Sequence, residues 1–204
     1  LDFGAGYTEQ ATDVAPSPDG SSIYVIRRHD LTTYRFVRQP DGSYARLAGW
    51  QLERYPAHGG VEKIYNPRGE YIATDAAGHI YFSSGLWATG MGADPAIVKY
   101  TPAGCYLTRM GKQAGFSWTL GDAHGSFGGL AVTANGARVF VTDINNSRVH
   151  RFDRQGNQAA SPYAPSLTMG MTQALDPDRD GACFTADGRM AAPYDLTMSA
   201  GGEV

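Results

Sequence analysis

The sequence lacks the features that mark membrane-spanning, nucleotide-binding and common hydrolytic proteins. No run approaches the roughly 18 consecutive apolar residues of a membrane-spanning helix. The net charge is −3, so no global basic field favours a nucleic acid as partner. Neither a G-x-S-x-G elbow, a P-loop nor an H-E-x-x-H motif is present. We therefore assign no catalytic residue from the sequence and expect neither a nucleic-acid partner nor a membrane span.

Cysteine is scarce, and its placement excludes two kinds of site. The chain has 2 cysteines, Cys105 and Cys183, whose spacing matches no zinc knuckle. No C-x-x-C-H motif exists for covalent haem attachment, so a haem cofactor is not expected. The pair forms either one disulfide in an oxidising compartment or two buried thiols in different parts of the chain, and the spacing does not choose between them.

What the sequence does have is a segment that returns at a fixed interval. Residues 13–25 read DVAPSPDGSSIYV, 71–82 read YIATDAAGHIYF, 129–141 read GLAVTANGARVFV, and 195–204 read DLTMSAGGEV. The copies begin at 13, 71, 129 and 195, at steps of 58, 58 and 66 residues. A repeat of this length is one supersecondary unit used several times.

Each copy predicts two strands joined by a tight turn, followed by further strands. Asp-Gly and Asn-Gly between β-prone runs favour hairpins, because these residues tolerate positive φ. Third strands are predicted at 33–37, 96–100 and 148–152, and fourth strands at 44–50, 105–110 and, more weakly, 158–163. Aromatic residues suited to flat sheet faces occur at Trp50, Tyr81, Tyr100, Phe140 and Phe152.

Four-stranded antiparallel sheets that repeat along a chain predict an all-β fold of the β-propeller type. A single sheet cannot bury both of its faces, so the sheets must pack on one another as blades. The expected blades cover 8–58, 66–112, 124–165 and a truncated 190–204, with an inserted acidic loop at 176–187. Since propellers carry four to eight blades, we expect an incomplete ring, completed by further blades of the same protein or by another chain.

The third copy resembles an NHL repeat, the unit of a large family of propellers. The resemblance covers residues 129–157 and rests on the Gly129 opening, the Asn135-Gly136 turn, the strand 139–143, the NNSRV run from 145 to 149 and the FDRQG ending. The first copy departs from the pattern at Ile26-Arg27-Arg28, and the second departs more, at 83–87. The resemblance implies the fold, and the fold alone does not imply a function.

An acidic motif at 176–187, DPDRDGACFTAD, resembles the calcium loops of EF-hands and, more closely, of dockerin modules. Such loops surround a hard cation with six to eight oxygen ligands and place glycine at the sharp turn, as Gly181 is placed here. The predicted calcium ligands are Asp176, Asp178, Asp180 and Asp187 through carboxylates and Ala182 through its carbonyl. The alternative is a solvated acidic turn, because Asp187-Gly188 also suits a hairpin and no helices flank the loop.

Other candidate residues have a weaker pattern. Some NHL-like amidating lyases hold zinc with histidines near the start of the innermost strands, but the equivalent positions here (Thr12, Glu70, Gly128 and Tyr194) are not histidine. Zinc is therefore not expected, although His58 and His124 lie in loops before innermost strands and form an alternative metal or acid–base pair. Basic residues at 27–29 and 148–154 are interpreted as solvated blade edges, and 87–94 as a surface loop or a cover for a partner.

The sequence thus favours a non-catalytic binding or scaffold propeller, extracellular or in the cell envelope, and possible as a homo-oligomer or part of a larger assembly. The calcium motif indicates the location, because extracellular calcium fills weak sites. One alternative is a propeller lyase or hydrolase with a metal in its central channel. The other is a structural subunit of a surface filament, in which neighbouring chains cover the open blade faces.

Overall fold

The protein is all β wherever the structure describes the chain. The computed structural model describes residues 10–27, 30–56, 64–65, 67, 69–84, 96–110, 127–143, 148–153, 167–170 and 196–197. These residues form three four-stranded antiparallel sheets and one two-stranded ribbon, with no helix among them. None of the described segments therefore provides a helix with the length and apolar character needed to cross a membrane.

Each four-stranded sheet is one blade, and its strands follow one another in the chain. Blade 1 consists of β1 (Ala11–Pro16), β2 (Ser22–Arg27), β3 (Thr33–Arg38) and β4 (Tyr44–Arg46). Blade 2 consists of β7 (Tyr71–Thr74), β8 (Ile80–Ser84), β9 (Ala96–Tyr100) and β10 (Tyr106–Met110). Blade 3 consists of β11 (Phe127–Val132), β12 (Arg138–Asp143), β13 (Arg148–Asp153) and β14 (Leu167–Gly170). Within every blade the order in space is the order in sequence.

The first hairpin turn of each blade has the same construction, and its positions recur at the predicted step. The turns begin at Ser17, Asp75 and Thr133, and each carries a glycine in the left-handed region at Gly20, Gly78 or Gly136 (φ 67°, 80° and 64°). In each turn an oxygen of the first side chain accepts a 2.9 Å hydrogen bond from the backbone N–H of the residue that closes the turn. The Asp-Gly, Ala-Gly and Asn-Gly signals in the sequence therefore predicted these turns correctly.

The turn of blade 2 is one residue shorter than the other two. It closes between Asp75 and His79, whereas the turns of blades 1 and 3 close over 17–22 and 133–138. The missing residue lies in the turn, so the second strand keeps its orientation and the same faces stay buried. The register confirms this, because three equivalent pairs face each other across the hairpins: Val14 with Val25, Ile72 with Phe82, and Leu130 with Val141.

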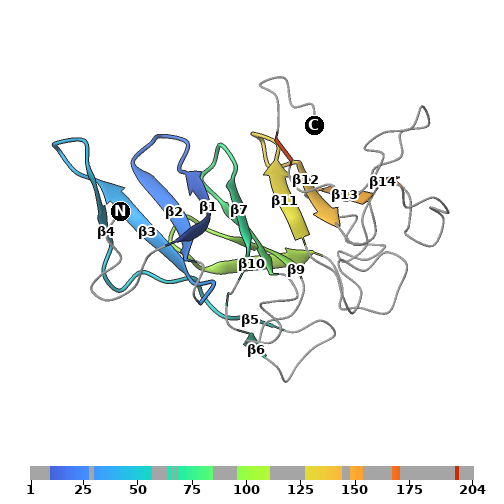
Figure 1. Ribbon diagram of the computed structural model, residues 1–204, viewed down its shortest axis with the longest axis horizontal. Coiled ribbons are helices and arrows are strands. Elements are labelled where there is room, and N and C mark those ends of the chain that lie inside the picture. Colours follow the sequence, from blue (N-terminus) through green and yellow to red (C-terminus); the bar gives the residue numbers. More distant parts are fainter. Residues whose placement is uncertain are drawn as a thin grey trace.

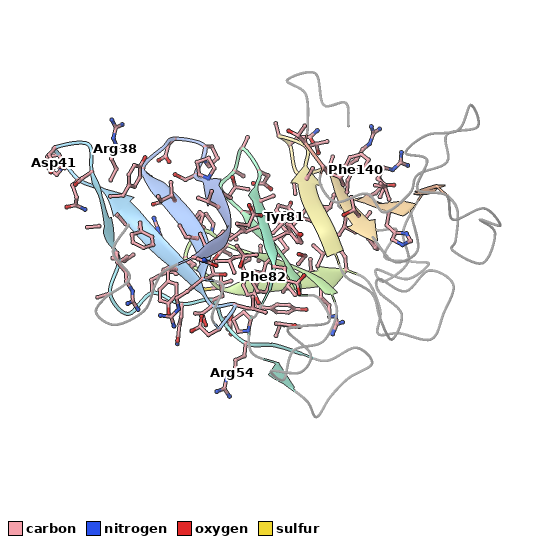
Figure 2. All side chains as sticks on the ribbon, viewed as in Figure 1. Arg38, Asp41, Arg54, Tyr81, Phe82 and Phe140 are labelled. Carbon is pink, nitrogen blue, oxygen red and sulfur yellow. The ribbon has the colours of Figure 1, made fainter. Side chains whose placement is uncertain are left out.

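The blades pack face to face through apolar side chains. Phe82 belongs to the buried cluster between blades 1 and 2, and the adjacent Tyr81 belongs to the cluster between blades 2 and 3. Figure 2 shows both side chains in the middle of the molecule. Both side chains are almost fully buried, and burial of an aromatic side chain of this size contributes about 2 kcal/mol to stability.

The three blades stand side by side as in a β-propeller. The innermost strands are neighbours, because β1 contacts β7 and β7 contacts β11, and Figure 1 shows the sheets spread as a fan from these strands. Sequential four-stranded antiparallel blades that pack face to face around shared inner strands define the propeller architecture. The predicted fold class is confirmed, and the aromatic residues Tyr81, Tyr100, Phe140 and Phe152 are buried as expected.

One predicted fourth strand is wrong in its bounds, and another falls on residues that the structure does not describe. The strand expected at 44–50 ends at Arg46, because the chain then crosses toward blade 2, where Leu52 and Tyr55 are buried in the cluster between the blades. The strand expected at 158–163 lies outside the described residues, and the described strand that pairs with β13 is β14, at Leu167–Gly170. A short ribbon of β5 (Tyr55–Pro56) and β6 (Ile64–Tyr65), between blades 1 and 2 in the sequence, was not predicted.

Candidate functional site

A cavity of about 580 Å³ lies between blade 1 and the chain that leads into blade 2. It lies at the end of blade 1 where β2 connects to β3, opposite the first hairpin turn. A volume of this size is within the range of small-molecule sites in proteins. Its described lining residues are Thr32, Thr33, Gln51, Leu52, Glu53, Arg54 and Pro67.

The first wall of the cavity is fixed by a compact turn between β2 and β3. Asp30 forms an ion pair with Arg27 and accepts a 3.1 Å hydrogen bond from the backbone N–H of Thr32. Burial raises the pKa of Asp30, but the bonds from Arg27 and Thr32 outweigh it and the net pKa lies below its ordinary value. Leu31 has φ 55°, which is rare for leucine, and its carbonyl accepts a 3.2 Å bond from the N–H of Gly69. The turn is thereby tied to the segment that enters blade 2.

The second wall is the segment that follows β4, and blade 2 holds it in place. The backbone N–H of Glu53 donates to the carbonyl of Gly104 at 2.8 Å. The carboxylate of Glu53 accepts a 2.8 Å bond from the N–H of Tyr106. Leu52 is buried in the cluster between the blades, so the segment is anchored by both polar and apolar contacts. The cavity is thus formed by residues that are far apart in the sequence.

The lining offers hydrogen bonds and little net charge. Thr33 is 3% exposed, and its hydroxyl has no hydrogen-bond partner among the described residues. The lining residues carry two hydroxyls, one amide, one guanidinium and one carboxylate, and that carboxylate, of Glu53, already accepts a hydrogen bond from the N–H of Tyr106. The side chain of Arg54 points away from the body of the molecule in Figure 2, which places its charge outside the cavity. The chemistry therefore suits a neutral ligand with several hydroxyl groups better than an ion.

A second cavity, of about 300 Å³, lies at the opposite end of the same two blades, between their first hairpin turns. Arg35 crosses it, donating to the hydroxyl of Ser22 at 3.1 Å and to the carbonyl of Pro102 in blade 2 at 3.2 Å. Hydrogen bonds from Ser17 and then Ser21 lower the pKa of Asp19, beside it, to about 2. Both charged groups form hydrogen bonds within the protein. We therefore interpret the residues around this cavity as a structural connection between the two blades.

The most connected polar side chain in the described residues is Asp75, between blades 2 and 3. It is 3% exposed and accepts hydrogen bonds from the N–H groups of Ala77 (3.0 Å) and His79 (2.9 Å) and from the hydroxyl of Tyr81 (3.0 Å). The ring nitrogen Nδ1 of His79 lies 2.9 Å and Nζ of Lys99 lies 3.7 Å from its Oδ2. Every contact is internal, which indicates a structural hub and not a catalytic group.

Most of the predicted site residues lie outside the described part of the chain. This holds for all five predicted calcium ligands (Asp176, Asp178, Asp180, Ala182 and Asp187), for His58 and His124, and for the loop 87–94. Among the described residues no group of three or more His, Cys, Asp or Glu side chains is placed to hold a metal ion. The calcium site and the histidine pair therefore stay predictions.

Of the basic candidates, Arg28, His29 and Arg154 lie outside the described residues, and those that the structure describes have structural roles. His150 is fully buried beside Phe152, with ring centroids 6.4 Å apart, and Arg151 lies 3.5 Å from the carboxylate of Asp153. Arg27 is paired with Asp30 and stacks on Tyr34. The prediction of solvated blade edges is wrong for His150, which is fully buried within blade 3. Cys105 is a free and exposed thiol, so the expectation of a buried thiol is wrong there, because Cys105 lies in the exposed turn between β9 and β10.

Sequence reasoning did not identify the residues of the larger cavity. Thr33 was predicted only as the first residue of a strand, and residues 51–54 follow the predicted strand 44–50 without any role assigned to them. No local signal distinguishes them, since the cavity exists only because the segment after β4 leaves its own blade and attaches to the next. The one irregular feature nearby, the left-handed Leu31, is visible only in the structure.

Comparison with known proteins supports the fold. No family model matches the sequence, and no curated protein is similar to it. The chain resembles a solved structure described as a putative 6-phosphogluconolactonase from Bacteroides uniformis, with 16% identity, a TM-score of 0.53, and coverage of 94% of this chain and 48% of that one. It also resembles the hydrazine synthase of Kuenenia stuttgartiensis, with 10% identity, a TM-score of 0.50, and coverage of 99% and 43%. The chain thus spans less than half the length of either structure, and both likenesses concern the fold alone.

Proposed function

We propose that this protein is a non-catalytic binding propeller that holds a small, neutral, hydroxyl-rich molecule in the cavity between blades 1 and 2. The single observation that carries the proposal is that cavity, about 580 Å³ in volume, whose lining residues include Thr33, the hydroxyl of which is buried and has no hydrogen-bond partner among the described residues. A buried hydroxyl without a partner costs free energy, and a ligand that hydrogen-bonds to it recovers that cost. The apolar side chains of Leu52 and Pro67 offer a surface for the carbon skeleton of such a ligand.

We further propose that the propeller is of the NHL type and acts outside the cell or in its envelope. The NHL-like segment of the third copy corresponds to β11, β12 and β13, and its Asn135-Gly136 turn has the expected positive φ at Gly136. The calcium motif supports the location. Protein partners, or further blades of the same protein, complete the assembly in this proposal.

Ligand-observed NMR with a panel of neutral monosaccharides and sugar lactones tests the proposed function. At least one compound is expected to bind the wild-type protein, and the Thr33→Val variant is expected to bind it at least about tenfold more weakly, the equivalent of one lost hydrogen bond. The unfolding free energy of Thr33→Val should fall by no more than about 1 kcal/mol, because the hydroxyl has no partner among the described residues.

Thr12→Val is the matched control for that experiment. Thr12 is also a strand threonine, but it is exposed on β1 and does not line the cavity. The Thr12→Val substitution should leave the binding of the sugar or lactone unchanged. Binding that is equally strong in wild type and Thr33→Val, or no binding by any compound of the panel, would refute the assignment of the cavity.

The alternative is a hydrolase, and the one observation in its favour is the fold shared with the putative 6-phosphogluconolactonase. The same samples discriminate the two proposals when a sugar lactone is incubated with the protein and the release of acid is followed at constant pH. Release above the spontaneous rate, dependent on an added divalent metal, would favour the enzyme. Binding without turnover favours the non-catalytic propeller.

Calcium binding is a separate prediction from the sequence. We expect titration calorimetry of the intact protein to show one calcium site that is lost in Asp180→Ala, because the motif needs its third carboxylate. Asp41→Ala is the control, since Asp41 is an exposed carboxylate in a described turn whose oxygen accepts hydrogen bonds from Ser43. Equal calcium binding in wild type and Asp180→Ala would show that residues 176–187 form only an acidic turn.

A further inference from the structure

The interface between blades 1 and 2 repeats the one between blades 2 and 3, except that it lacks a carboxylate at the position of Asp75. The first hairpin turns and the cross-strand pairs make four residues around the smaller cavity, of about 300 Å³, equivalent to four residues of the hub at Asp75. The equivalent pairs are Ser17 and Asp75, Tyr24 and Tyr81, Arg35 and Lys99, and Gly78 and Gly136. A tyrosine, a cation and a glycine are thus kept at both interfaces, and the carboxylate is replaced by a serine.

The two oxygens of Asp75 have different roles between blades 2 and 3. Oδ1 accepts the N–H that closes the turn, at 2.9 Å. Oδ2 accepts the hydroxyl of Tyr81 at 3.0 Å and lies 3.7 Å from Nζ of Lys99. In blade 1, Oγ of Ser17 accepts the equivalent turn N–H, also at 2.9 Å. Because a serine side chain has no second oxygen, the position of Oδ2 has no counterpart between blades 1 and 2.

The space that corresponds to Oδ2 is open between blades 1 and 2. A Cβ added to Gly136 would lie 2.5 Å from Oδ2 of Asp75 and 2.8 Å from the hydroxyl of Tyr81, so this space is filled between blades 2 and 3. A Cβ added to the equivalent Gly78 would meet only Pro102 of its own blade within 4 Å, and no described atom of blade 1. The missing carboxylate has therefore left room for a ligand.

A proline removes the hydrogen bond that joins the turns at the other interface. Ala76, in the turn of blade 2, donates its N–H to the carbonyl of Ala134, in the turn of blade 3, at 2.7 Å. Pro18 has the equivalent position in blade 1, and proline has no N–H. The carbonyl of Ala76, a residue that lines the smaller cavity, receives no such bond from Pro18 and can accept one from a ligand.

The groups that line this cavity include the two kinds that contact the carboxylate in the hub. Arg35 donates to two neutral oxygens, the hydroxyl of Ser22 at 3.1 Å and the carbonyl of Pro102 at 3.2 Å, and these bonds use only part of the N–H groups of its guanidinium. Burial raises the pKa of Tyr24, so its hydroxyl stays protonated at neutral pH and can donate. A guanidinium and a hydroxyl that line one cavity suit the carboxylate of a ligand.

An exposed negative charge in the lining narrows the class of ligand. Asp19 is ionised at neutral pH, because hydrogen bonds from Ser17 and then Ser21 lower its pKa to about 2. These bonds end on Oδ1, so Oδ2 is the oxygen that can accept from a ligand. A purely anionic ligand would be attracted by Arg35 and repelled by Asp19, whereas a ligand with an ammonium beside its carboxylate is attracted by both.

We propose that the smaller cavity binds a small zwitterion with an ammonium group next to its carboxylate, the chemistry of a free α-amino acid. The ligand carboxylate takes the position that corresponds to Oδ2 of Asp75 and accepts hydrogen bonds from Tyr24 and Arg35. The ligand ammonium donates to Asp19 and to the carbonyl of Ala76. A volume of about 300 Å³ restricts the ligand to one with a small side chain. This site lies at the other end of the blades from the larger cavity, so it does not depend on the function proposed above.

Ligand-observed NMR of the intact 204-residue protein with glycine, L-alanine, acetate and methylammonium tests this proposal. Glycine or alanine is expected to bind the wild type, and acetate and methylammonium are expected to bind at least about tenfold more weakly, because each of them engages only one of the two charges. Ser17→Asp should weaken the binding of the amino acid at least about tenfold, since the new carboxylate fills the position of the ligand carboxylate, as Asp75 does in the hub.

Thr133→Asp is the matched control for Ser17→Asp. Thr133 begins the equivalent turn of blade 3 and does not line the cavity, so this variant should bind the amino acid as the wild type does. Tyr24→Phe is a second variant in case the new carboxylate disturbs the turn. It removes only the hydroxyl and should weaken binding about fivefold, the equivalent of one lost hydrogen bond.

Three results would overturn the proposal. The first is a wild type that binds neither glycine nor alanine. The second is equal binding of the amino acid by the wild type, Ser17→Asp and Tyr24→Phe. The third is binding of acetate or methylammonium that is as tight as that of the amino acid, because the ligand would then not need both of its charges.

Discussion

Replacing Gly136 with alanine is expected to lower the free energy of unfolding by about 3 kcal/mol, which corresponds to a decrease in Tm of about 6–12 °C for a protein of this size. Two effects contribute. A φ of 64° costs alanine about 1 kcal/mol relative to glycine. A Cβ at this position would also lie 2.5 Å from Oδ2 of Asp75 and 2.8 Å from the hydroxyl of Tyr81, closer than any relaxed contact. Urea unfolding followed by tyrosine and tryptophan fluorescence measures the change.

The repeat supplies an unusually well matched control, Gly20→Ala. Gly20 occupies the same position of the first turn with almost the same φ, 67°, but a Cβ there would meet no heavy atom within 4 Å. We expect Gly20→Ala to cost only about 1 kcal/mol, the conformational part alone. The difference between the two variants is thus the steric cost at the interface of blades 2 and 3. An equal loss of unfolding free energy in both variants would show that the side chains around Asp75 move aside at little cost. That result would contradict the steric effect expected from the close contacts described above.

The sequence was sufficient to predict the repeated parts of the fold, because those parts depend on local rules. The step of 58 residues locates the turns, Asp-Gly and Asn-Gly account for the positive φ at Gly20 and Gly136, and β-branched and aromatic residues mark the strands on both sides. Even the shorter turn at Asp75 is visible in the sequence, as a copy of 12 residues between copies of 13. No long-range information is needed for any of these features.

The candidate site could not be predicted in the same way, since it depends on contacts between distant segments. Thr33 lines a cavity only because Glu53, 20 positions later, is attached to Gly104 in the next blade. Val14 and Ile72 have the same position in the repeat, but Val14 is exposed and Ile72 is buried. The difference depends on which segments pack beside each strand, and this cannot be derived from the repeat itself. The role of Asp75 likewise depends on Lys99, which comes from another strand, and on Gly136, which comes from another blade.

Replacing Asp75 with alanine is the second change for which we expect a large effect, a loss of about 3 kcal/mol in the free energy of unfolding. The substitution removes the acceptor of the turn N–H groups of Ala77 and His79 and of the buried hydroxyl of Tyr81. It also removes the carboxylate that lies 3.7 Å from the mostly buried ammonium of Lys99, whose nitrogen lies 4.9 Å from the ring centroid of Tyr81. Asp19→Ala is the control, because Asp19 caps the equivalent turn at a fully exposed position.

The dependence of this loss on pH distinguishes the charge of Asp75 from its shape. Burial raises the pKa of Asp75, but the hydrogen bonds from His79 and Tyr81 outweigh it, so the folded-state pKa lies below the ordinary 3.8. A depressed carboxylate pKa stabilises the folded state above about pH 4 and loses that contribution as the pH falls through the folded-state value. Asp75→Asn should therefore be less stable than wild type at pH 7, and the difference should shrink as the pH falls below 4. A difference that stays constant down to pH 2 would show that the carboxylate charge contributes nothing. In the Asp75→Ala background, Gly136→Ala should lose part of its steric cost, because the oxygen that its Cβ would meet at 2.5 Å is gone while the hydroxyl of Tyr81 at 2.8 Å remains.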